Sequence, residues 1–321
     1  MRFCYAHRRF TLYPDNLNSW DLTPDAYNGA FLKRVKAIGF DALEVGAEVI
    51  EKTGGSERQV KEFGRRLAGA GLPIGCVRAG GTLTDARNGP KNQERQMKAI
   101  QFAGWAGAEV VNGALSAPSR YPGHPPGSKP GSQYGWPVSQ DSSRDAMHYN
   151  FEALAKALQA ACDRASHWGV NISVEVHQNS LVDNSWSAQL IHQMVGRKNF
   201  GLNPDLGNVY WTYDVPEEST DDSIRKLAPI SVYWHCKNLM RVYHPENQRS
   251  VFLRVPLQDG EIDYRFAISA MAAAGYQGYM AIEGAWAGDQ FHADQKSLEY
   301  SKGIWAEWEE KPASRAHTKR A

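Results

Sequence analysis

Several features that would assign this 321-residue chain to a familiar class are absent from it. Its four cysteines show no Cys-x-x-Cys spacing, and a disulfide framework is not expected in a chain of this length. No apolar run reaches the length of a membrane span, and the stretch from Met1 to Arg9 has no apolar core of a signal peptide. We therefore expect a reduced, cytoplasmic protein with no membrane partner.

An excess of charge of one sign is also lacking. The chain has 36 Lys and Arg against 35 Asp and Glu, which leaves a net charge of +1. Such a charge provides no field for attracting nucleic acid, so no nucleic-acid partner is expected. A Gly-rich phosphate turn is missing after the first expected strand, at 2–6. Its absence argues against an open, doubly wound sheet.

Short apolar strands alternate with helical patterns along the chain. Strands are expected at 2–6, 40–45, 72–77, 108–112, 171–177, 200–205, 231–237 and 278–283. Helices are expected at 25–38, 57–70, 93–106, 147–168, 187–195, 222–227, 264–274 and 295–309. Because eight parallel strands with alternating helices close into a ring, the pattern predicts one (β/α)8 TIM barrel over residues 1–310.

Three segments depart from this alternation. Residues 116–143 are rich in Pro and Gly and follow the fourth strand; a long insertion of this kind is expected either to act as a lid or docking surface at the mouth of the barrel or to be disordered. Residues 241–256 are expected to form a second overhanging loop. The tail at 311–321 is charged and without periodicity, so it is expected to be flexible.

Ionisable residues end four successive strands of the second half, and they are Glu175, Asp205, His235 and Glu283. The carboxyl ends of the strands meet at one face of a barrel, so these side chains are expected to converge there. Three carboxylates and one imidazole suit a divalent cation. We expect Mn²⁺, with Mg²⁺, Co²⁺ or Zn²⁺ as alternatives. A single strand-end glutamate would more often be a salt-bridge partner; the repeated placement predicts a metal site.

Other polar and aromatic residues near the expected mouth have two interpretations each. His177 lies two residues beyond Glu175 and should point to the same side of the strand, as an additional base or as a group that orients a ligand. Lys237 either binds a substrate hydroxyl or pairs with an acid. Trp286 either stacks on a sugar or aryl face or packs in the core. Three further residues are expected to be structural or merely near the mouth: His7, Glu44 and His148.

Five segments together resemble the xylose-isomerase-like TIM barrel superfamily, especially its sugar isomerase and epimerase branch. They are Val174-Glu175-Val176-His177, Asn203-Pro204-Asp205-Leu206-Gly207-Asn208, Trp234-His235-Cys236-Lys237, and the stretches at 257–264 and 275–283. The resemblance implies that Glu175, Asp205, His235 and Glu283 hold one metal and that the two glutamates also act as acid and base.

The resemblance also implies substrate contacts. Family members often carry an arginine six residues beyond the metal histidine, and here that residue is Arg241. They often carry a histidine three residues beyond the metal aspartate, where this chain has Asn208. The substitution departs from the epimerase pattern and changes what this position can offer a substrate.

The resemblance and the chemistry together predict a metal-dependent isomerase, epimerase or lyase acting on carbohydrates. The proton next to a sugar carbonyl is weakly acidic, and a cation that stabilises the enediolate supplies several kcal/mol while a side chain takes the proton. An alternative is the catalytic subunit of a C-glycoside deglycosidase, which eliminates an aglycone from a 3-oxo-glycoside in complex with a small second subunit.

Two other classes remain as alternatives. A nuclease of the endonuclease IV type shares the barrel but would need several metals and a basic face. A barrel that only binds a sugar or a partner would not need the acids at the strand ends, so their presence argues against this class. We accordingly expect a sugar, keto-sugar or glycoside substrate, and either a small second subunit or a homo-oligomer.

Overall fold

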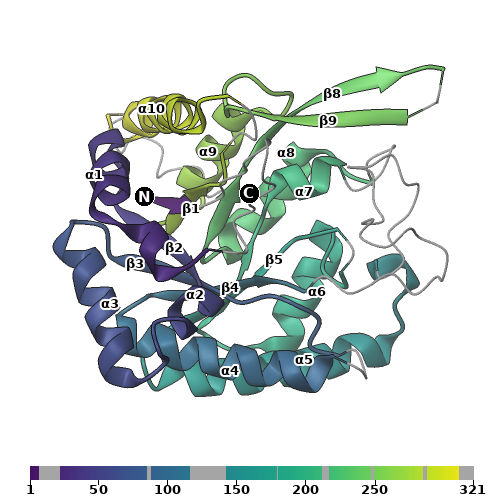
Figure 1. Ribbon diagram of the computed structural model, residues 1–321. Helices are drawn as coiled ribbons and strands as arrows, with labels where there is room; N and C mark the ends of the chain where they lie inside the picture. The colour runs from purple at the N-terminus through teal and green to yellow at the C-terminus, as the bar shows by residue number, and fades with distance from the viewer. Residues whose placement is uncertain are drawn as a thin grey trace.

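The computed structural model describes residues 1–6, 22–84, 88–115, 142–178, 180–211, 217–246, 249–284 and 288–310. Its main strands are β1 (Arg2–Ala6), β2 (Ala42–Gly46), β3 (Ile74–Arg78), β4 (Val110–Ala114), β5 (Asn171–Glu175), β6 (Phe200–Asn203), β7 (Trp234–Cys236) and β10 (Tyr279–Ile282). They form one eight-stranded sheet in the order β6-β5-β4-β3-β2-β1-β10-β7. A parallel bridge between Leu202 and Ser231 brings the two end strands together. The predicted (β/α)8 barrel is confirmed (Figure 1).

Helices surround this barrel on the outside (Figure 1). They are α1 (Gly29–Ile38), α2 (Ala47–Glu51), α3 (Glu57–Gly69), α4 (Gly89–Ala106), α5 (His148–Ser166), α6 (Ser185–Val195), α7 (Leu206–Trp211), α8 (Thr220–Leu227), α9 (Tyr264–Ala273) and α10 (Gln290–Glu309), with 3-10 turns η2 (Pro24–Tyr27), η4 (Ser143–Asp145) and η5 (Ala228–Ile230). Ser56 and Gln59 form a capping box at the start of α3, and Gly39, with φ of 108°, ends α1. None of the described helices is both long and apolar enough to cross a membrane.

The helix expected at 25–38 is in two parts. The chain forms the turn η2 first, and α1 then begins after Asn28, whose side chain accepts a hydrogen bond from the Phe31 N–H. Asn28 is a strong N-cap residue, so it starts a new helix rather than continuing the preceding turn.

The interior of the barrel is filled separately from the layer between strands and helices. A small buried cluster inside the strands combines two tyrosines, Tyr233 and Tyr279, with alanine, valine and cysteine side chains. The larger core lies between the strands and the helices. Because side chains fill the barrel, the polar groups at the strand ends open to one face only.

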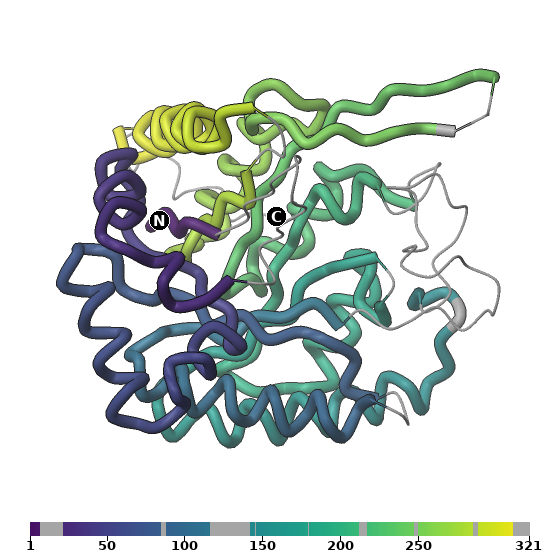
Figure 2. The backbone as a smooth tube through the Cα atoms, viewed as in Figure 1, coloured from purple at the N-terminus to yellow at the C-terminus, as the bar shows by residue number. Residues whose placement is uncertain are grey.

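The segment expected as an overhanging loop at 241–256 is instead mostly an antiparallel hairpin. Its strands are β8 (Asn238–His244) and β9 (Arg249–Val255), and the pairing sets Leu239 opposite Arg254. The hairpin projects from one side of the barrel (Figures 1 and 2). The expectation of a loop was wrong because a two-stranded ribbon needs no continuous apolar run. Burial alternates along β9, where Ser250 and Phe252 are buried and Val251 and Leu253 are exposed, whereas residues 240–243 of β8 are all exposed.

Two predicted segments lie largely outside the residues that the structure describes. The Pro- and Gly-rich insertion follows β4, as expected, but its residues 116–141 are not among those described. The expected tail at 311–321 also lies outside the described residues.

Candidate metal centre

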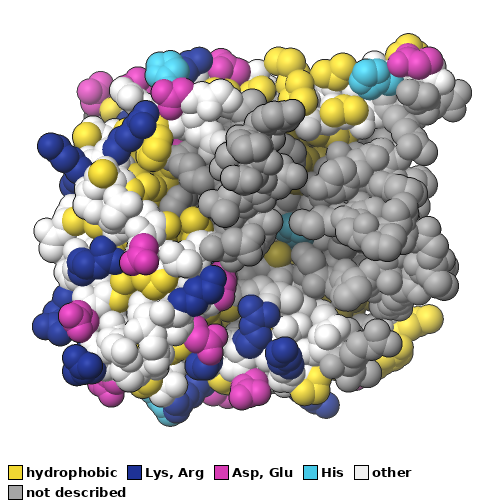
Figure 3. Space-filling model, in the orientation of Figure 1, with side chains coloured by type: hydrophobic (Ala, Val, Ile, Leu, Met, Phe, Trp, Pro, Cys, Tyr) yellow, Lys and Arg dark blue, Asp and Glu magenta, His cyan; other side chains and the backbone are white. Residues whose placement is uncertain are grey.

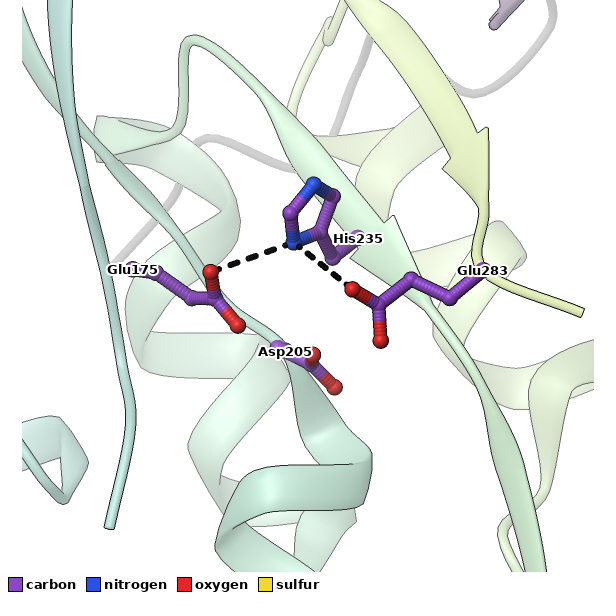
Figure 4. A group of neighbouring side chains, drawn as sticks. All are labelled: Glu175, Asp205, His235 and Glu283. Carbon is purple, nitrogen blue, oxygen red and sulfur yellow. Dashed lines mark ion pairs between the residues drawn. The ribbon is translucent and has the colours of Figure 1, made fainter. Parts of the chain in front are cut away.

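The structure brings the four predicted strand-end residues together (Figure 4). One ligand atom from each of Glu175, Asp205, His235 and Glu283 lies within 4.8 Å of the others. His235 Nδ1 is 3.2 Å from Glu175 Oε2 and 3.5 Å from Glu283 Oε1. Their strands, β5, β6, β7 and β10, end at the same face of the barrel, which is why residues up to 108 positions apart in sequence meet.

This donor set fits a divalent cation. All four side chains are buried, and Asp205 and His235 are 0% exposed. His235 Nδ1 has no hydrogen-bond partner within the described part of the chain, although it faces two carboxylates. Three carboxylates buried in so small a space are stabilised by positive charge among them. Three oxygen donors and one imidazole nitrogen are a common set for Mn²⁺, Mg²⁺ or Zn²⁺.

The pKa values of these groups show how strongly they interact. Burial opposes the charged form of His235, but the carboxylates of Glu44, Glu175 and Glu283 outweigh it and raise its pKa to about 10. Burial also opposes ionisation of Glu175, yet the charge on His235 holds the pKa of Glu175 well below its usual range. For Asp205, burial prevails over the attraction of Lys237 and raises the pKa to about 7. The carboxylates therefore stabilise a positive charge placed among them.

Glu44, on β2, holds His235 from inside the barrel. His235 Nε2 lies 2.6 Å from Glu44 Oε2, and the Tyr233 hydroxyl donates to the same oxygen at 3.0 Å. Arg78 lies 3.8 Å from the other Glu44 oxygen and 3.1 Å from Glu48. An Nε2–H directed at Glu44 leaves Nδ1 to face the cluster, the usual way a buried carboxylate orients a metal-binding histidine. Glu44 was expected to be structural or merely near the mouth; its contact with His235 gives it a position from which it orients a candidate ligand.

Asn208 holds Glu175 in the same manner. Its Nδ2 donates to Glu175 Oε1 at 2.8 Å and to the Val176 carbonyl at 3.0 Å, and its Oδ1 accepts from Trp211 Nε1 at 3.2 Å. The side chain is fully buried at the start of α7. Asn208 thus orients a ligand of the candidate site; the substrate contact suggested by the resemblance stays a prediction.

Two cations stabilise the opposite side of the centre. Lys237 donates to Asp205 and, at 3.1 Å, to Glu283 Oε2. Arg254, on β9, has its NH1 atom 3.3 Å from the same Glu283 oxygen. Both cations lie over the ring of Trp211, at 5.3 Å and 5.4 Å from its centroid. Lys237 therefore pairs with acids, one of its two predicted alternatives. Sequence reasoning missed Arg254 because only the hairpin register directs it inward.

The other predicted residues lie in varied places. Arg241 is exposed on β8, and its main-chain N–H donates to Glu261 at 2.7 Å. His177 is partly buried, with Nδ1 2.6 Å from the Gln178 carbonyl, and burial lowers its pKa. His148 is exposed and lies 3.4 Å from Glu152. Trp286 and His7 lie outside the described residues. The roles predicted for Arg241, His177 and Trp286 stay predictions.

Residues 32–304 match the family described as xylose isomerase-like TIM barrel. The chain belongs to that family. None of the curated protein sequences matches it, so solved structures carry the remaining comparison.

Three solved structures illustrate the likeness. A xylose isomerase-like TIM barrel protein from Mycobacterium smegmatis in complex with magnesium is 22% identical, with a TM-score of 0.71 and coverage of 96% of this chain and 97% of that one. D-psicose 3-epimerase from Clostridium cellulolyticum H10, solved with D-tagatose, is 16% identical, with a TM-score of 0.68 and coverage of 95% and 99%. The 3-keto-D-glucoside 4-epimerase of E. coli is 15% identical, with a TM-score of 0.64 and coverage of 94% and 99%. At these identities the likeness shows the fold.

Proposed function

We propose that this protein is a divalent-metal-dependent enzyme that removes a proton next to the carbonyl of a sugar or keto-sugar, as an isomerase, epimerase or lyase. The observation that carries the proposal is the buried set of three carboxylates and one imidazole within 4.8 Å at the carboxyl ends of the strands. The family and the named activities of two similar structures, both sugar epimerases, support the substrate class. Mn²⁺ is the cation we expect there.

The chain's own residues divide the chemistry between them. A divalent cation held by Glu175, Asp205, His235 and Glu283 would stabilise the negative charge that proton removal leaves on the substrate oxygens. Glu175 and Glu283 face each other across His235 Nδ1 (Figure 4), so one carboxylate takes the proton and the other returns it on the opposite face. His177 is an additional acceptor near Glu175. In a lyase, the same proton removal would expel a leaving group instead.

Solvent exchange tests the proposal directly. The purified protein, loaded with Mn²⁺, is incubated in D₂O with a panel of ketohexoses and 3-keto-glucosides, and deuterium next to the carbonyl is measured by NMR. We expect incorporation into at least one substrate and none with the Glu175→Gln variant. Metal analysis that finds no divalent cation bound at saturating Mn²⁺, or equal exchange by Glu175→Gln, would contradict the proposal.

A second candidate function is the elimination catalysed by C-glycoside deglycosidases on 3-oxo-glycosides, in a complex with a small second subunit. Asn208 favours it, because this chain lacks the histidine that epimerases of the family often carry at this position. The side chain present instead donates to Glu175 and has no ionisable group. Aglycone release from a 3-oxo-C-glycoside, followed by absorbance, distinguishes a lyase from an epimerase. A homo-oligomer is the arrangement expected of the isomerase or epimerase, and light scattering measures it.

The nuclease alternative is disfavoured by surface charge. On the described part of the face shown in Figure 3, basic and acidic side chains are interspersed rather than gathered into a basic surface. Binding to a phosphate backbone requires such a surface. We expect no nicking of DNA at abasic sites.

A further inference from the structure

We propose that Lys237 is an internal counter-cation of the metal centre, which weakens the binding of the divalent metal and keeps the loaded centre positive. This inference rests on the metal site of the proposed function and adds a regulating residue to it. Lys237 bridges two of the four candidate ligands, Asp205 and Glu283. Any cation bound by those carboxylates therefore has an ammonium group as a close neighbour.

The protein is built to keep Lys237 in this position. Its side chain is 2% exposed, and its stem lies so close to Gly207 that a Cβ added there would be 2.5 Å from Lys237 Cγ. The Tyr264 hydroxyl donates to the Lys237 carbonyl at 2.9 Å. The ammonium also lies 5.3 Å from the centroid of the Trp211 ring. A lysine that merely paired with an acid at the surface would need none of these contacts.

The net charge of the centre explains what such a lysine does. Among the described residues, the three carboxylates of the centre meet two side-chain cations besides His235, namely Lys237 and Arg254. With His235 neutral, as binding a metal through Nδ1 requires, a divalent cation brings the sum of these charges to one positive charge. Without Lys237 the loaded centre would be neutral. The lysine therefore opposes metal binding by repulsion, yet it leaves a positive centre for the negative charge that develops on the substrate.

The test compares Mn²⁺ binding by the wild type and the Lys237→Met variant, which keeps the length of the side chain and removes its charge. A like charge within about 4–6 Å changes an ionic equilibrium by roughly 10- to 1000-fold, so we expect the variant to bind Mn²⁺ at least about tenfold more tightly in calorimetric titration. The metal-free variant should melt at a lower temperature, because Asp205 and Glu283 then lie close together without the lysine, and Mn²⁺ should raise its melting temperature more than that of the wild type.

The matched control is Lys98→Met, which removes the same charge from a half-exposed lysine that pairs with Glu51 on the helical surface; its Mn²⁺ affinity should equal that of the wild type. If Lys237→Met fails to fold, Arg254→Met serves as a second variant, and it too should bind Mn²⁺ more tightly than the wild type. Unchanged or weaker Mn²⁺ binding by the Lys237→Met protein, or by Arg254→Met in its place, would overturn this proposal alone. A wild type that binds no divalent cation would overturn the proposed function as well.

Discussion

The two sides of the candidate metal centre are stabilised by different means. Glu175 and His235 are held by an amide and a carboxylate, from Asn208 and Glu44. Glu283, on the other side, is held by two cations, Lys237 and Arg254. The first arrangement directs donor atoms, because each hydrogen bond fixes one ring or carboxylate plane. The second offsets charge. Within one buried cluster, hydrogen bonds thus orient Glu175 and His235, whereas cations offset the charge of Glu283.

These two sides also come from different parts of the molecule. The orienting side is built from strands β2, β5 and β7 and the start of α7, all within the barrel. The charged side needs the hairpin, because Arg254 reaches Glu283 from β9. The barrel thus provides the geometry common to such sites, while the hairpin changes its charge.

The largest effect is expected for His235→Ala. This change removes the nitrogen ligand and leaves the Glu44 carboxylate without its imidazole partner. Turnover should fall by about 10³-fold or more, since both the cation and the proton transfer depend on the cluster. Calorimetric Mn²⁺ titration and the deuterium-exchange rate measure it. Retention of Mn²⁺ affinity by this variant would show that the cation binds elsewhere.

A smaller effect is expected for Glu44→Gln, which keeps the shape and removes the charge that directs His235. Loss of such an orienting partner typically costs 10- to 100-fold in metal affinity. Glu48→Gln is the matched control, because Glu48 pairs with Arg78 rather than with His235 and is 28% exposed. The comparison fails if both variants lose Mn²⁺ affinity equally, as measured by the same titration.

A third variant, Asn208→Leu, removes a residue that does not belong to the candidate ligand set but orients one of its members, Glu175. The variant loses the hydrogen bond to the buried Glu175 carboxylate, whereas Trp211 Nε1 keeps its bond to Gln178 at 3.1 Å. Loss of a partner that orients a metal ligand typically costs 10- to 100-fold in metal affinity or activity, so kcat should fall by about tenfold, with the fold intact by circular dichroism. A change in KM alone would instead support the predicted substrate contact at this position.

The smallest effects distinguish the two faces of the hairpin. Phe252 is 5% exposed and packs against Trp211, whereas its neighbour Val251 is 45% exposed. We expect Phe252→Leu to reduce the free energy of unfolding by about 1 kcal/mol and to alter Mn²⁺ binding through Arg254. Val251→Ala should change stability by less than about 0.5 kcal/mol and leave Mn²⁺ binding unchanged. Thermal melting and titration of the pair measure both; equal effects would contradict a role for the buried face.

Much of the fold and of the candidate ligand set was predictable, because both follow from local patterns. Strand and helix periods can be counted along the chain, and an acid at the end of each strand is visible without knowing the neighbours. The partners of those acids were not predictable in the same way. Glu44 and His235 are 191 positions apart, and the contact between them depends on which strands face each other across the barrel.

The hairpin shows the same limit more sharply. The residues at 241–256 do not indicate which face of the ribbon turns inward. A shift of the β9 register by one residue would move Arg254 to the opposite face of the hairpin, away from Glu283. By itself, the sequence determined the barrel and the four residues at its strand ends, because backbone periodicity is a local property. Only the tertiary structure decided their partners and the charge of the centre, because burial makes a group's electrostatics depend on neighbours that arrive from elsewhere in the chain.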